Sequence, residues 1–408
     1  MSFGYHIICF LISVLLSTNA FSQDFDLNKK SFQRIHIFMD VATTPSLLQM
    51  VEYIKTPKED LKIISWRRFQ GYDKSIDFDK ENTIEIIFSN RETGIHLNGN
   101  YVASKVHEIY KRFPNALYTI HANDKHFYVH GVQLLSFIPK KQIEMIHLYE
   151  DGNATKFRYY RDEKEFEIPS VEDLKQQIIA EEKKSYYPYD LVLSHLYPVT
   201  YHVFFLNKMR EQNSHERYLK AVSKGILINV DYAEIGKNLS DTDRKKLFRL
   251  AGFDYDQLNT LFSKKKNIVI TLPYLKKDSE TFQSMTRVIG FLMIDGFNII
   301  NPDDYTFFYK PHPSLSNYEG NKTLSTLFPE MVFLPRRLPY ELLILGNLNV
   351  NYVVGTLSSL FFTLKPNQIL KWFFEKNYYP PLLYSKIITD EQEIDLKKVM
   401  DFLNKNGI

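Results

Sequence analysis

Short apolar runs alternate with longer mixed runs along most of the chain, and this alternation predicts strands separated by helices. The first strand is expected at residues 35–39 and is followed by a helix at 46–53. Further strands are expected at residues 61–65, 84–88, 116–120, 143–148, 267–271, 305–309, 331–334 and 350–354. Strands that alternate with helices are typical of a parallel sheet covered on both faces. The pattern therefore predicts an α/β protein.

The length of 408 residues suggests two domains. A polar, lysine-rich stretch at 170–185 separates the two groups of predicted strands, and a Pro/Tyr segment ending at 197–202 follows it. We therefore expect a boundary near residue 190, with an N-terminal domain at 23–190 and a C-terminal domain at 191–385. Two such α/β halves facing across a cleft would place a ligand between them.

Composition excludes several classes of site. The net charge of +3 gives no sign of a nucleic-acid binder. The single cysteine, Cys9, excludes a disulfide framework and a cysteine-based metal site or nucleophile in the folded body. No histidine cluster has the spacing of a metal site, so we expect a site that needs no metal or other cofactor.

The N-terminus carries an apolar run at residues 7–16, and the small residues Ala20 and Ser22 follow it. This pattern predicts a signal peptide at 1–22 that is cleaved before Gln23. The alternative is a short uncleaved membrane anchor. Either interpretation predicts an exported or membrane-associated protein, with peripheral membrane association as one form.

A rigid histidine follows the strand expected at 305–309. Lys310-Pro311-His312-Pro313 holds His312 between two prolines, each of which restricts the backbone. Ligands bind at the carboxyl ends of strands in open α/β sheets. An imidazole there can act as a general acid or as a charge partner for a phosphate, although a merely solvated turn histidine is the alternative.

Two acidic residues follow the strand expected at 143–148. In Tyr149-Glu150-Asp151-Gly152, one carboxylate can point into a cleft as a general base while the other points away. The alternative is an ordinary Asp-Gly turn.

Hydroxyl groups and a further acid follow later strands. Ser358 and Ser359 precede an apolar, helix-like run and can form a phosphate site at its N-terminus, or simply cap it. Glu341 can bind the hydroxyls of a ribose, or can instead favour the dipole of a short helix. Together these features describe a sugar-nucleotide transferase.

The order and spacing of these motifs resemble the bacterial sialyltransferases of the Pasteurella and Photobacterium/Vibrio type, which carry a D-D-G or D-E-G motif and an H-P motif. The resemblance covers nearly the whole chain after the leader. The similar segments are 37–45, 64–69, 130–134, 149–152, 197–202, 308–313, 338–341 and 358–362.

The resemblance implies a GT-B architecture of two Rossmann-like domains, with the C-terminal segment 386–408 returning to the first. It implies an inverting, metal-independent transfer of N-acetylneuraminic acid from CMP-Neu5Ac to a terminal galactoside, by a monomer that binds no nucleic acid. The linkage stays open between α2,3, α2,6 and α2,8.

The family roles transfer to individual residues of this chain. Asp151 matches the general base and His312 the general acid. The matching donor-binding residues are Thr43, Lys310, Pro311, Glu341, Ser358 and Ser359. The residues expected to contact acceptor or sialic acid are His130, Gly152, Asn153 and Tyr274.

Three positions depart from the family pattern. Glu150 stands where the first motif acid is usually Asp, and Pro311 stands where Gly precedes the motif histidine. Tyr274 lies in the segment where many members carry an acceptor-side tryptophan, which leaves acceptor preference open. The competing hypotheses are a GT-B glycosyltransferase that uses another sugar nucleotide, and an inactive sialoside- or nucleotide-binding relative.

Overall fold

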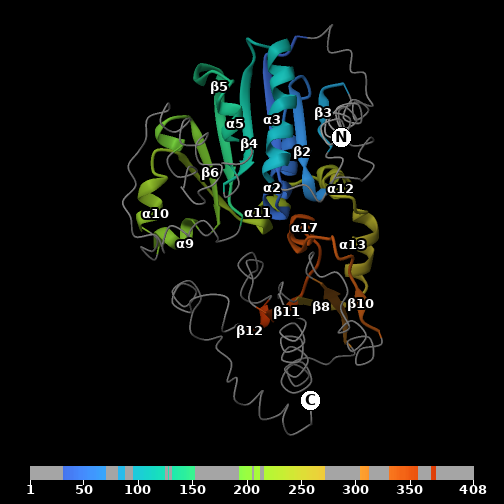
Figure 1. Ribbon diagram of the computed structural model, residues 1–408. Helices are drawn as coiled ribbons and strands as arrows, with labels where there is room; N and C mark the ends of the chain where they lie inside the picture. The colour runs from blue at the N-terminus through green and yellow to red at the C-terminus, as the bar shows by residue number, and fades with distance from the viewer. Residues whose placement is uncertain are drawn as a thin grey trace, which may run out of the picture. The chain divides into compact units, whose positions relative to one another are not determined.

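The computed structural model describes residues 31–69, 81–87, 95–124, 127, 131–151, 193–204, 206–211, 216–271, 304–311, 330–356 and 369–373. The chain divides into two compact units (Figure 1). One comprises Met1–His202 and Arg217–Ile228, and the other comprises Val203–Glu216 and Asn229–Ile408. Each unit contains a sheet and helices, so the expected α/β class is confirmed.

The first unit is built on a seven-stranded sheet with the strand order β3-β2-β1-β4-β5-β6-β7. Neighbouring strands from β3 to β6 pair in parallel. The carboxyl ends of these strands therefore lie at the same edge of the sheet. The strands are β1 (Arg34–Asp40), β2 (Leu61–Trp66), β3 (Thr83–Glu85), β4 (Leu117–Asn123), β5 (Ile143–Tyr149), β6 (Val199–Phe204) and β7 (Ile226–Val230).

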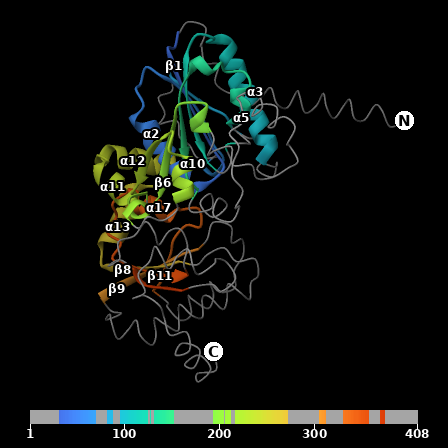
Figure 2. The same ribbon diagram turned by 90° about the vertical axis from the view of Figure 1, so that its left-hand side faces the viewer.

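Helices cover both faces of this sheet. Helix α2 (Thr43–Lys55) lies on one face and α3 (Ile95–Arg112) on the other (Figure 2). Pro45 is tolerated in the first turn of α2, where backbone N–H groups have no partner within the helix. The helix ends before Pro57, and the Thr56 amide donates to the Glu52 carbonyl oxygen over 2.9 Å. Helix α2 thus runs from the carboxyl edge of the sheet back along its face.

Short helices complete the region of the first sheet. Three are 3-10 helices: η3 (Arg67–Phe69), η4 (Lys140–Gln142) and η5 (Leu193–His195). The α-helices are α5 (Val132–Leu135) and α10 (Glu216–Ala221).

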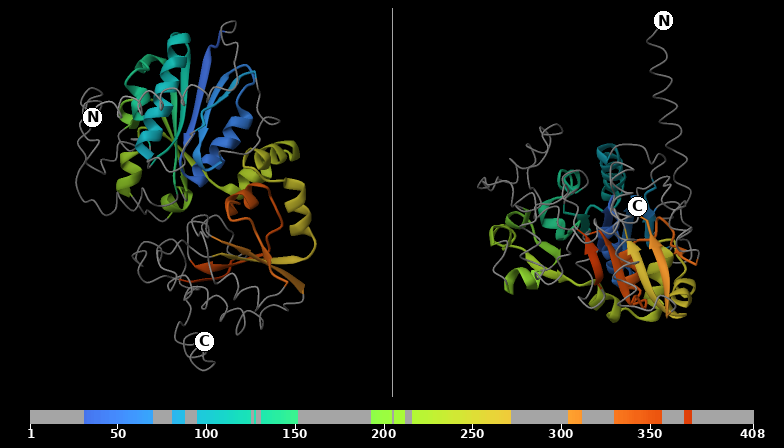
Figure 3. Two further views of the ribbon diagram at one scale, coloured as in Figure 1. Left: turned by 45° about the vertical axis from the view of Figure 1, so that its right-hand side comes forward. Right: turned by 90° about the horizontal axis from the view of Figure 1, so that it is seen from below.

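The second unit is built on a five-stranded parallel sheet with the order β10-β9-β8-β11-β12 (Figure 3). Its strands are β8 (Lys266–Thr271), β9 (Tyr305–Lys310), β10 (Val332–Phe333), β11 (Tyr352–Thr356) and β12 (Ile369–Phe373). Its helices are α9 (Leu206–Glu211), α11 (Tyr232–Asn238), α12 (Asp241–Leu250), α13 (Tyr255–Ser263) and α17 (Tyr340–Leu345).

Capping residues set the starts of three of these helices. Asp231, Ser240 and Asp254 precede α11, α12 and α13, and each side chain accepts a hydrogen bond from a backbone amide in the first turn. The start of α17 lacks such a side-chain cap, and Pro339 stands at its N-cap position.

Gly355 permits a close approach of β11 to β8. A Cβ atom at this position would lie 2.1 Å from the Thr271 carbonyl oxygen, which is far inside contact distance. Only glycine fits the sheet there. Gly355, which lies three residues before the predicted phosphate-binding Ser358, therefore has a structural role inside β11.

The first sheet extends beyond residue 190, the boundary expected from the sequence, because β6 and β7 belong to it. The sequence pattern had assigned the segment at 197–202 to the region between the halves, and it gave no strand at β7 or β12. Among the helices of the described ranges, none is both long and apolar enough to cross a membrane.

Candidate functional site

The candidate site in the first unit is the carboxyl edge of its sheet, where Asp151 follows β5. Asp151 is half-buried, whereas the preceding Glu150 is only 1% exposed. The Glu150 amide donates to the His202 carbonyl oxygen on β6 over 3.2 Å. The Asp151 amide donates to Asp124 Oδ1, just after β4, over 3.3 Å. The strands on both sides of β5 therefore hold the turn that carries the two acids.

Asp40, the last residue of β1, is a second acid at this edge and is only 2% exposed. Its Oδ1 accepts the Ala42 amide over 2.6 Å and the Asn123 side-chain amide over 3.5 Å. Its Oδ2 accepts Gln49 Nε2 over 3.0 Å. Burial raises the pKa of Asp40 well above its usual range, and the nearby charge of Asp151 raises it further. Asp40 and Asp151 therefore interact electrostatically.

Thr43, the predicted donor-side residue, opens α2 just after this network and is half-buried. Arg68 Nε donates to the Val41 carbonyl oxygen over 3.2 Å, which joins the segments after β1 and β2. Burial, together with the charge of Arg68, lowers the pKa of Arg67. Polar groups from β1, β2, β4 and β5 thus gather at the edge where Asp151 lies.

Four histidines from adjacent strands form a continuous row on the α2 side of the sheet. His121 stacks on His147 with ring centroids 4.6 Å apart. His147 Nδ1 lies 3.1 Å from His202 Nε2, and His36 Nδ1 lies 3.5 Å from His121 Nε2. His121 and His202 are buried, whereas His36 and His147 are half-buried. We call His36, His121, His147 and His202 the histidine row.

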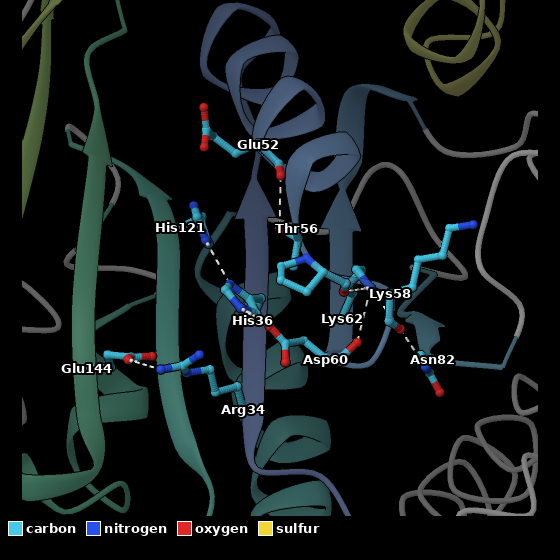
Figure 4. Close-up of polar contacts among 11 residues, drawn as sticks. Arg34, His36, Glu52, Thr56, Lys58, Asp60, Lys62, Asn82, His121 and Glu144 are labelled. Atoms are coloured by element: carbon cyan, nitrogen blue, oxygen red, sulfur yellow. Dashed lines mark hydrogen bonds and ion pairs between the residues drawn. The ribbon is translucent and has the colours of Figure 1, made fainter. Parts of the chain in front are cut away.

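Polar partners at both sides fix the tautomers of two of these rings. Asp60 Oδ2 lies 3.1 Å from His36 Nε2 (Figure 4). Since a carboxylate can only accept, His36 donates to Asp60 and its Nδ1 accepts from His121. His121 Nδ1 then accepts the hydroxyl of Tyr149 over 2.8 Å. In the part of the chain that the structure describes, no group of three or more His, Cys, Asp or Glu side chains is arranged to hold a metal ion.

In the second unit, Lys310 ends β9 and is only 5% exposed. Its ammonium donates to the Pro311 carbonyl oxygen and, over 3.1 Å, to that of Arg336. Burial lowers the pKa of Lys310 to about 8, although the nearby Glu341 carboxylate raises it. Glu341 is half-buried in the first turn of α17. Lys310, Pro311 and Glu341 are thus neighbours at one edge of the second sheet.

Several predicted site residues lie outside the described part of the chain. They are His130, Gly152, Asn153, Tyr274, His312, Ser358 and Ser359. The leader 1–22, the boundary near 190 and the C-terminal segment 386–408 also lie outside it.

Asp40, Asn123 and Asp124 were not among the site residues expected from the sequence, although Asp40 lies in the segment 37–45 that resembles the family. Asn123 and Asp124 form a polar pair two residues after the apolar run at 116–120, which is a visible signal in the sequence. Their partner, the Asp151 amide, is distant in sequence, so the contact itself is invisible without the fold.

No protein-family model and no curated protein matches this chain. Solved structures do match it. The GT-B domain of a sialyltransferase from Photobacterium damselae has a TM-score of 0.66 at 19% identity, covering 91% of this chain and 97% of its own. An α/β-galactoside α-2,3-sialyltransferase from Photobacterium phosphoreum has a TM-score of 0.66 at 21% identity, with coverage of 92% and 96%.

A 2,6-sialyltransferase from Photobacterium sp. JT-ISH-224, solved with CMP and lactose, has a TM-score of 0.65 at 18% identity. The match covers 92% of this chain and 76% of the chain of that enzyme. The expected fold resemblance is confirmed: this chain has the α/β GT-B fold of the bacterial sialyltransferases that its motifs resemble.

Proposed function

We propose that the protein is an inverting sialyltransferase that moves N-acetylneuraminic acid from CMP-sialic acid to the hydroxyl of a terminal galactoside without a metal. Asp151 removes the proton of the acceptor hydroxyl, and His312 assists the departure of CMP. The residues proposed to bind the donor are Thr43, Lys310, Pro311, Glu341, Ser358 and Ser359.

The observation that carries the proposal is the position of Asp151 within this fold. A half-buried carboxylate follows β5 at the carboxyl edge of a parallel sheet, which is where α/β proteins bind ligands. Fold likeness to sialyltransferases over 91% of the chain supports the same assignment. A carboxylate within hydrogen-bonding reach of an acceptor hydroxyl has the chemistry of a general base.

The second unit supplies features that suit an anionic nucleotide. Lys310 brings a cation to the end of β9, and Glu341 brings a carboxylate that can accept from ribose hydroxyls. CMP leaves as a phosphate monoester dianion, so proton donation or positive charge at the phosphate lowers the barrier. His312, the residue after Pro311 in the sequence, is the group proposed for that role.

The test is CMP release from CMP-Neu5Ac with lactose as acceptor, in the presence of EDTA. Wild-type protein should form sialyl-lactose, and EDTA should not change the rate. Asp151→Asn keeps the shape of the side chain but removes the base, and should slow transfer by about 10²–10⁴-fold. Asp254→Asn, at the start of α13, is the matched control and should keep the wild-type rate.

The outcomes separate the competing functions. Turnover of another sugar nucleotide in place of CMP-Neu5Ac would indicate a different glycosyltransferase. Binding of CMP without turnover would indicate an inactive binding relative. Wild-type transfer by Asp151→Asn would overturn the base assignment.

The same reaction also shows which linkage the protein forms, because its product can be analysed directly. The matching structures include an α-2,3- and a 2,6-sialyltransferase, and both linkages suit the proposed base. NMR of the product formed on lactose will distinguish them, because the galactose carbon that bears the new bond shifts.

A further inference from the structure

The segment just after β5 that carries Asp151 is held by a side chain that follows the neighbouring strand β4. Asp124 follows β4 and makes two bonds at the end of β5: its amide donates to the carbonyl oxygen of Tyr149, the last residue of β5, over 3.0 Å, and its Oδ1 accepts the amide of Asp151, just after β5, over 3.3 Å. The two bonds flank Glu150, so Asp124 fixes the backbone on both sides of that residue. The second bond depends on the Asp124 side chain alone, and substitution can remove it.

Asp124 can hold the backbone beside it because its own position is restricted by burial and a hydrogen bond. It is only 6% exposed, and its carbonyl oxygen accepts the Phe127 amide over 3.4 Å. The preceding Asn123 is only 2% exposed, and its side-chain amide reaches Asp40. A buried acceptor with few alternative positions holds its partner more firmly than an exposed one.

The same network reaches the segment that begins with Val41. Asp40 accepts the Ala42 amide and Asn123 Nδ2 through the same oxygen, Oδ1. Asp124 accepts the Asp151 amide. The start of α2, with Thr43, and the turn with Asp151 are therefore connected through two adjacent residues at the end of β4.

We propose that Asp124 is a positioning residue that fixes Asp151 for removal of the acceptor proton. This inference rests on the proposed function. The bond engages the main-chain amide of Asp151, so it sets the position of the Cα atom without engaging the carboxylate that takes the proton. Proton transfer requires the base within hydrogen-bonding distance of the hydroxyl, and a small displacement of the base slows it strongly.

Two substitutions separate positioning from general damage. Asp124→Ala removes the acceptor, and should lower kcat by about 10–100-fold while the KM for CMP-Neu5Ac changes less than about threefold. Asp124→Asn keeps an oxygen in the same place and should retain kcat within about threefold of wild type. Asp254→Ala also removes an aspartate that accepts a backbone amide, over 2.9 Å from Gln257, and should leave both constants unchanged.

A second measurement does not depend on turnover. Hydrogen exchange of the peptide that spans residues 148–152 should be faster in Asp124→Ala than in wild type, and close to wild type in Asp124→Asn. If Asp124→Ala fails to fold, Asp124→Glu displaces the acceptor by one methylene group and should show the same loss of kcat and faster exchange.

The results distinguish this inference from the proposed function. If the wild-type protein releases no CMP, the proposed function is wrong. The hydrogen-exchange measurement then still decides whether Asp124 holds Asp151. An active wild type whose Asp124→Ala variant keeps both kcat and slow exchange overturns the positioning role. Equal loss of kcat in Asp124→Ala and Asp124→Asn would overturn it as well, since the amide oxygen can accept the same bond.

Discussion

Acidification should destabilise the protein through the histidine row, and His202 gives the sharpest test. His202 is buried, stacks on Tyr149 at 4.2 Å and contacts His147 Nδ1. Burial, together with the smaller effects of the charges of His147 and of Lys55 on α2, lowers the pKa of His202 to about 3. The folded protein therefore keeps this ring neutral over a wide range of pH.

The sign follows from proton binding in the two states. Between pH 6.5, the ordinary pKa, and about 3, the unfolded chain binds a proton at His202 and the folded chain does not. The free energy of unfolding therefore falls as the pH falls through this window. Each pH unit below 6.5 costs about 1.4 kcal/mol, so His202 contributes a loss of about 2 kcal/mol between pH 7.5 and pH 5.0. This loss is large, because the total free energy of unfolding of a typical domain is only about 5–15 kcal/mol.

Other groups titrate in the same range, so the test compares variants. Asp40 has a raised pKa, so the folded state binds its proton more tightly than the unfolded state does, and its contribution to the free energy of unfolding increases as the pH falls. This contribution is common to wild type and His202→Gln, and it cancels in their difference when the two sites act independently.

The assay is urea unfolding at pH 7.5, 6.5, 5.5 and 5.0. His202→Gln should lose about 2 kcal/mol less than wild type across this range. His107→Gln removes a half-buried histidine of α3 that lies outside the row, and should follow the wild-type curve. Parallel pH curves for wild type and His202→Gln would refute the reasoning.

Two further predictions concern the second unit. Gly355→Ala places a Cβ atom against the Thr271 carbonyl oxygen, and should lower the free energy of unfolding by about 1–3 kcal/mol in denaturant titrations; unchanged stability would contradict the close approach. Lys310→Met removes the ammonium that bonds two loop carbonyls, and should raise the KM for CMP-Neu5Ac by about tenfold, the effect of one bond to a charged group. Lys266→Met, at the other end of the same sheet, should not change it, and equal KM values for both variants would count against a donor-site role for Lys310.

The sequence pattern predicted the central strands well, because they are apolar and buried on both faces. Strand β2 is buried at every position, and the predicted range 61–65 matches Leu61–Trp66 closely. Strand β7 was not predicted, although Ile226–Ile228 is a short apolar run; it lies at the end of the sheet order, where Ile226 and Ile228 remain exposed. Strand β6 was not predicted as a strand because prolines and tyrosines surround it in the sequence. No local pattern specifies the sheet in which it pairs.

By itself, the sequence determined the α/β class, the division into two sheets and the motif that contains Asp151. These follow from local periodicity and from residues that are adjacent along the chain. Only the tertiary structure decided that Asp124 accepts the Asp151 amide, that Asp40 joins the same edge, and that four histidines form one row. The physical reason is strand register: parallel pairing places residues far apart in sequence side by side, as it does for His121 and His147, and no local pattern specifies that pairing.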